Sequence, residues 1–177
     1  MALVLILRYT GILSAISNFT GTLLLKTGVM DAPLDAPAVI HEFTYDFTLQ
    51  DLEGHFLNAQ ELRGRTLFIN LWATWCGPCR VEMPSIESLY ARTDSSRVVF
   101  LMLSLDDFGN TDKVRKFVND RKFTFPVYIP AGALPPPLQV PSIPTTLVVS
   151  PDGKIVIRKS GIANYDTDEF ADFLKSL

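Results

Sequence analysis

The stretch that most constrains this chain is Trp75-Cys76-Gly77-Pro78-Cys79, which holds its only two cysteines at a C-x-x-C spacing. It follows the apolar run Thr66–Trp72, whose β-branched and aromatic residues predict a buried strand. Pro78 lacks a backbone N–H and suits the first turn of a helix. We therefore expect a strand–turn–helix unit, with Cys76 at the N-terminus of the helix and Cys79 just inside it.

This position favours reactive sulfur. Unpaired backbone N–H groups and the positive end of the helix dipole stabilise a thiolate, which is the reactive form of cysteine. A zinc site would need two further ligands, and the histidines, His41 and His55, lie upstream at no recognised zinc spacing. The sequence thus predicts thiol–disulfide exchange by a redox-active Cys76–Cys79 pair, with no metal and no other cofactor. Two buried, inert cysteines are the alternative.

The composition limits the class of protein. With 177 residues, 47% hydrophobic and 20% charged, the chain is long and apolar enough to bury the core of one domain with a short extension. Its net charge of −3 and the lack of a basic stripe argue against a nucleic-acid partner.

Residues 1–30 form a hydrophobic N-terminal segment that differs from the rest of the chain. They contain no acidic residue and only two basic ones, Arg8 and Lys26, and the stretch Tyr9–Leu25 is uncharged but short for a membrane span. We expect a membrane anchor or signal, which predicts an extracytoplasmic protein associated with a membrane. A cleaved signal and a packed helix are alternatives, and a cytoplasmic location stays open.

Residues 31–40, with two prolines and several small residues, predict an extended linker. The domain then spans 41–177, in the order β-β, β-α-β-α, β-β-α, which predicts a central mixed sheet with helices on its faces. The expected strands are Phe43–Leu49, Phe56–Leu57, Thr66–Trp72, Val98–Leu103, Phe125–Ile129, Thr145–Ser150 and Ile155–Lys159. The expected helices follow Pro78, Asn110 or Thr111, and a capping box of Asp166 and Glu169. The proline-rich segment 131–144 predicts a loop.

Together, the motif Trp72–Cys79, this order of elements and Pro144-Thr145-Thr146 before a hairpin resemble the thioredoxin superfamily. More closely, residues 41–177 resemble its TlpA/ResA-type thiol–disulfide oxidoreductases. The hairpin over residues 43–57, Asn70 in place of thioredoxin's buried acid, and Glu82-Met83-Pro84 favour that branch. The resemblance implies an α/β thioredoxin-like fold, a central mixed β-sheet flanked by helices, with an N-terminal β-hairpin extension. The loop 131–137 departs from the family, where a short helix is common.

The resemblance also implies roles for the residues of the motif. Cys76 is the attacking thiolate and Cys79 the resolving thiol, while Glu82 is a proton relay to Cys79. A solvated acid near the helix end is the alternative for Glu82. The residues expected to bind the client are Trp75, Gly77, Pro78, Ile143 and Pro144. Among them, Ile143–Pro144 resembles a cis-proline pair whose backbone docks an extended substrate strand.

The function that the resemblance implies is an enzyme that reduces disulfides of client proteins outside the cytoplasm. Apocytochrome c is one such client class, and an upstream membrane or soluble thiol reductant would restore the dithiol. A peroxiredoxin-like peroxidase is an alternative, although it requires a threonine where Ala73 stands. A non-enzymatic, thioredoxin-like subunit of a membrane assembly is another, and it draws only on the N-terminal segment.

Overall fold

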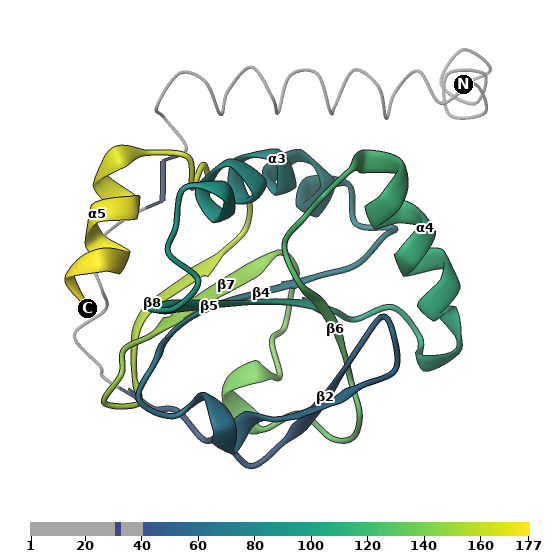
Figure 1. The fold of residues 1–177 in the computed structure, drawn as a ribbon. Coiled ribbons are helices and arrows are strands. Elements are labelled where there is room, and N and C mark those ends of the chain that lie inside the picture. Colours follow the sequence, from purple (N-terminus) through teal and green to yellow (C-terminus); the bar gives the residue numbers. More distant parts are fainter. Residues whose placement is uncertain (1–30, 33–40) are drawn as a thin grey trace.

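The computed structural model describes residues 31–32 and 41–177, so the expected anchor or signal and most of the expected linker lie outside the described residues. One eight-stranded sheet runs through this part of the chain, in the order β1-β8-β7-β4-β5-β6-β2-β3 (Figure 1). Its strands are β1 (His41–Glu42), β2 (Thr48–Asp51), β3 (Phe56–Asn58), β4 (Thr66–Trp72), β5 (Val98–Ser104), β6 (Val127–Pro130), β7 (Thr145–Val149) and β8 (Lys154–Ser160). Central β4 pairs parallel with β5 and antiparallel with β7, which makes the sheet mixed, as predicted.

All three α-helices of the described residues lie on the same face of the sheet (Figure 1). They are α3 (Gly77–Ala91), α4 (Thr111–Arg121) and α5 (Asp168–Ser176). The opposite face is covered by the 3-10 turns η1 (Ala59–Leu62) and η3 (Pro136–Leu138), whose buried residues belong to a second apolar cluster. The helices thus cover one face of the sheet. The order of the elements in the sequence does not determine which face each helix covers.

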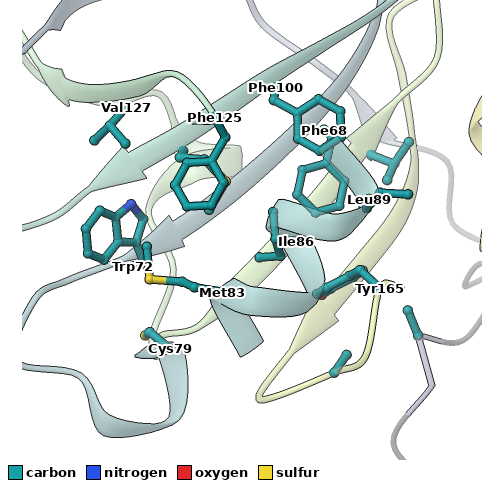
Figure 2. Close-up of a cluster of buried hydrophobic side chains, with 14 of the residues drawn as sticks. Phe68, Trp72, Cys79, Met83, Ile86, Leu89, Phe100, Phe125, Val127 and Tyr165 are labelled. Atoms are coloured by element: carbon teal, nitrogen blue, oxygen red, sulfur yellow. The ribbon is translucent and has the colours of Figure 1, made fainter. Parts of the chain in front are cut away.

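Strand β4 explains why the core has two halves. Every residue of this strand is buried, and alternate side chains point to opposite faces of the sheet. Phe68 and Trp72 pack with Met83 and other residues of α3 on the helical side (Figure 2). Leu67, Ile69 and Leu71 pack on the other side. Asn70 shares the parity of Phe68 and Trp72, so the only amide of the strand faces α3.

The predicted N-terminal hairpin is confirmed, with a shorter first strand. β2 pairs antiparallel with β3, but β2 begins at Thr48 and not at Phe43. Burial still alternates along residues 43–49, because Phe43, Tyr45 and Phe47 point into the second cluster. The alternation correctly identified the buried face, but residues 43–47 are not a strand. The ends of this segment still hydrogen-bond to neighbouring backbone, since the Phe43 N–H donates to the Gly153 carbonyl at 2.8 Å and the Phe47 carbonyl accepts from the Ala59 N–H at 3.1 Å.

Two local predictions are wrong in detail. The last helix is capped one residue later than predicted, because the Thr167 hydroxyl, and not Asp166, accepts a hydrogen bond from the backbone N–H of Phe170 at 3.1 Å. The segment 131–144 is not wholly irregular, since Pro136–Leu138 forms a 3-10 turn with Leu138 buried. Prolines fit the first positions of such a turn because their missing N–H would be unpaired there in any case.

Asp31 and Ala32, at the start of the expected linker, lie against the loop before α5. The backbone N–H of Ala32 donates to the Asn164 carbonyl at 2.9 Å, and the Asn164 side chain donates to Asp31 at 2.8 Å. None of the helices in residues 31–32 and 41–177 is long and apolar enough to cross a membrane.

Candidate active site

The two cysteines form a disulfide at the N-terminus of α3, with their Cα atoms 5.3 Å apart. Cys76 is the N-cap residue of the helix, and its sulfur accepts a hydrogen bond from the backbone N–H of Cys79 at 3.2 Å. Cys76 keeps 5% of its surface exposed, whereas Cys79 keeps none. Because thiol–disulfide exchange needs direct access to sulfur, an incoming partner can reach Cys76 first.

The residues predicted to bind a client surround Cys76. Trp75 is 65% exposed, and Pro78 is exposed beside it on the first turn of α3. The carbonyl oxygen of Ile143 lies 3.8 Å from the Cys76 sulfur, although the two residues are 67 positions apart. The Ile143–Pro144 peptide bond is cis. These residues form a partly apolar rim around Cys76.

Glu82 lies in the core, one turn beyond Cys79 on α3, with its side chain fully buried. Oε1 accepts a hydrogen bond from Asn70 Nδ2 at 2.8 Å, and Oε2 accepts one from the backbone N–H of Ala163 at 3.1 Å. Burial raises the pKa of Glu82 to about 8, because desolvation outweighs both hydrogen bonds and the positive charge of Lys159. A carboxyl with this pKa carries a proton at neutral pH and can exchange it there, which a solvated acid cannot.

Asn70 connects this carboxyl to the strand that follows Pro144. Its Nδ2 also donates to the Thr146 hydroxyl at 2.9 Å, across the β4–β7 pairing. Tyr165 is buried nearby, and burial together with the Glu82 charge raises its pKa well above the ordinary value. The phenol therefore stays neutral. Glu82 is held by neutral partners, and its own proton is the mobile one in this cluster.

Asp106 is a site residue that sequence reasoning missed. It lies just after β5 with its side chain almost fully buried, and it accepts hydrogen bonds from the Thr74 N–H at 2.7 Å and the Thr74 hydroxyl at 2.6 Å. The Ser104 hydroxyl donates to the same carboxylate at 2.9 Å. Asp106 thereby holds the loop that carries Trp75 and Cys76. The available signal was the Ser104-x-Asp106 pattern at the end of a buried strand.

The chemistry available here is that of two thiols and one buried acid. Within residues 31–32 and 41–177 no group of three histidine, cysteine, aspartate or glutamate side chains could hold a metal ion. The paired sulfurs can accept or donate two electrons, and Glu82 can accept or donate one proton beside them. This is the chemistry of dithiol–disulfide exchange.

Comparison with known proteins agrees with this geometry. Residues 40–158 match the AhpC/TSA family. The thiol–disulfide oxidoreductase ResA of Halalkalibacterium halodurans is 31% identical over 136 residues, which cover 76% of either chain. The fold is similar to StoA from Bacillus subtilis (TM-score 0.57, 24% identity, 80% of this chain and 97% of that one). It is also similar to a secreted disulfide oxidoreductase of Mycobacterium tuberculosis (TM-score 0.62, 22% identity, 75% and 97%).

These similarities establish the fold and the class of enzyme. The structural neighbours show the thioredoxin-like fold. The ResA relative is named a thiol–disulfide oxidoreductase, and a cysteine pair at the start of a helix can perform that reaction. The chain belongs to the AhpC/TSA family and, within it, is a thiol–disulfide oxidoreductase of the ResA type with a thioredoxin-like fold.

Proposed function

We propose that this protein reduces disulfide bonds of client proteins outside the cytoplasm, with Cys76 as the attacking thiol. The observation that carries the proposal is the unequal exposure of the two cysteines, since Cys76 keeps 5% of its surface exposed and Cys79 keeps none. The exposed Trp75 and the Ile143 carbonyl lie next to Cys76. In the reduced protein, the Cys79 N–H that now contacts the Cys76 sulfur would stabilise a thiolate there.

The reaction would proceed in two exchanges. The Cys76 thiolate attacks one sulfur of the client disulfide, forms a mixed disulfide and releases one client thiolate, which takes up a proton. Cys79 then passes its proton to the ionised form of Glu82, which is the minor form at neutral pH because the pKa of Glu82 is about 8, and attacks the Cys76 sulfur. This step breaks the mixed disulfide, closes the Cys76–Cys79 bond and releases the second client thiolate, which takes up a proton. Two electrons pass to the client, and an upstream thiol reductant must return them.

Glu82 suits the second exchange because of its position and its pKa. It follows Cys79 by three residues on α3, so both side chains lie on the same side of the helix. Its pKa of about 8 is close to that of an ordinary thiol, which allows the proton to move in either direction at small cost. Its burial fits the relay role and not that of a solvated acid.

The extracytoplasmic location is part of the proposal. It draws on the apolar composition of residues 1–30, and one structural neighbour is itself described as secreted. Proteins that mature outside the cytoplasm acquire disulfides that some pathways must reduce again, and apocytochrome c is one client class of this kind. Residues 1–30 would tether the domain to the membrane near its reductant.

The reduction potential tests the direction of electron flow. A value near −270 mV is typical of a reductase and one near −120 mV of an oxidant. We expect the purified protein to equilibrate with glutathione or dithiothreitol near the reducing value and to catalyse insulin reduction. A strongly oxidising potential would contradict the proposed direction. Catalysed consumption of hydrogen peroxide would instead favour the peroxidase alternative.

A further inference from the structure

Two arginines lie over one aromatic ring beside the cysteine pair. The guanidinium carbon of Arg121, at the end of α4, is 4.7 Å from the centre of the Phe117 ring, and that of Arg80 on α3 is 5.9 Å from it. Phe117 also packs against Trp72, with ring centroids 5.5 Å apart. The guanidinium groups of Arg80 and Arg121 therefore both lie near the Phe117 ring, although their like charges repel each other.

These two charges lack the partners that their neighbours have. Within α4, Lys113, Arg115 and Lys116 each form an ion pair with an aspartate. Among the described residues no carboxylate lies within ion-pair distance of Arg80 or Arg121, and Asp120 pairs with Lys116 instead. The Arg80 Nε atom is buried without a hydrogen-bond partner. Burial and the charge of Arg80 lower the pKa of Arg121, and the charge of Asp120 offsets them only in part.

The pair is connected to the cysteine pair through the first turn of α3 and through Trp72. The Arg80 N–H donates to the Cys76 carbonyl at 3.2 Å, so Arg80 starts one helical turn after the accessible cysteine. Trp72, which contacts Phe117, belongs to the same buried cluster as Cys79 (Figure 2). Arg121 is exposed and Arg80 half-buried, so both can meet a ligand at the surface.

We propose that Arg80 and Arg121 form a binding site for a carboxylate of the client polypeptide, an aspartate or glutamate close to the cysteine that Cys76 attacks. This inference rests on the proposed function and names the clients it favours. Arginine suits the role because its planar guanidinium stacks on an aromatic ring and still presents N–H donors to a carboxylate. A client with lysine at that position would meet two like charges.

The test uses three disulfide-linked peptides that differ only in the residue beside the cysteine, which is glutamate, glutamine or lysine. Reduction by the dithiol form of the full chain is followed at peptide concentrations below KM, in about 20 mM and about 500 mM salt. We expect the glutamate peptide to give a kcat/KM about five-fold above that of the glutamine peptide at low salt, the size expected for two partly exposed charge contacts. The lysine peptide should give a lower kcat/KM than the glutamine peptide, and high salt should make the kcat/KM values of the three peptides nearly equal.

The double variant Arg80→Gln/Arg121→Gln should lose the preference. The matched control Arg158→Gln/Lys175→Gln removes two positive charges from β8 and α5, and should keep it. The ratio between peptides is the readout, because it cancels any change in the reactivity of the cysteines themselves. Equal rates in the wild type, or a preference that survives in the double variant, would overturn the inference alone. A protein that reduces none of the peptides would contradict the proposed function and this inference with it.

Discussion

Asn70 donates a hydrogen bond to Glu82 at 2.8 Å and so joins the centre of the sheet to the helix of the cysteine pair. With the Ala163 N–H it gives the carboxyl two donors that favour its charged form. Burial nevertheless dominates and raises the pKa of Glu82 to about 8. The site therefore keeps a protonated acid at neutral pH within one turn of Cys79.

The free energy of unfolding should fall with rising pH because of Glu82. The native state binds a proton at Glu82 up to about pH 8, whereas the unfolded chain releases it near pH 4.5. Native protein therefore holds the extra proton in this window, and the free energy of unfolding decreases as pH rises through it. The decrease should total on the order of 3–5 kcal/mol. Glu82→Gln should lack it in urea unfolding at pH 5 to 9, while Glu61→Gln, at an exposed position of η1, should retain it. Parallel wild-type and Glu82→Gln curves would contradict this account.

Removing the Asn70 donor should raise the pKa of Glu82 further. Asn70→Ala deletes a hydrogen bond that lowers this pKa, so the carboxyl should titrate above about 8. Thr146→Val removes the other contact of Asn70 and leaves its bond to Glu82 in place, which makes it the matched comparison. Carbon-13 NMR of the Glu82 carboxyl measures the shift directly. An unchanged titration in Asn70→Ala would show that Asn70 does not act on the acid.

The Asp106–Thr74 contact should support the cysteine loop. Asp106→Ala leaves the Thr74 N–H, the Thr74 hydroxyl and the Ser104 hydroxyl without their acceptor, which should cost about 3 kcal/mol of stability. Thr74→Val removes one hydroxyl donor and should cost about 1–2 kcal/mol, whereas Thr74→Ser keeps the donor and should cost less. Chemical denaturation of the oxidised protein gives these values. Equal stability of Thr74→Val and Thr74→Ser would argue against the contact.

The reduced protein should be alkylated at Cys76 and not at Cys79. Only Cys76 is accessible, and the Cys79 N–H lies next to its sulfur. Brief treatment with iodoacetamide followed by mass spectrometry should place at least about ten-fold more label on Cys76, since thiolate character and exposure both favour it. Equal labelling of the two cysteines would contradict the difference in access.

Much of the fold follows from local sequence patterns. The continuous apolar run Thr66–Trp72 forms the buried central strand. Pro78 lies in the first turn of α3, the helix whose N-terminus holds the cysteine pair. Residues 43–47 show the limit of such patterns, because their burial alternates although the segment is not a strand. The N-cap of α5 is Thr167 and not the predicted Asp166, because these two adjacent side chains can both accept a hydrogen bond from the start of a helix.

The polar contacts of the site depend on pairs that are far apart in sequence. Glu82 could be singled out because Glu82-Met83-Pro84 resembles the TlpA/ResA type, but its hydrogen-bond partners, Asn70 and Ala163, lie 12 and 81 residues away. Asp106 reaches Thr74 across 32 residues because β4 and β5 are parallel neighbours. Arg80 and Phe117 lie 37 residues apart, and only the folded arrangement of α3 and α4 places Arg80, together with Arg121, over the Phe117 ring.

The most direct test of the central claim is to trap the mixed disulfide. Reduced Cys79→Ser protein cannot complete the second exchange, so a disulfide-containing client should remain bound to Cys76 and be released by dithiothreitol. Cys76→Ser should trap little client under the same conditions, since Cys79 is buried. Non-reducing electrophoresis with mass spectrometry of the linked peptides identifies the cysteine. A stable adduct through Cys76 is the predicted result, and equal trapping through Cys79, or none in either variant, would contradict the account.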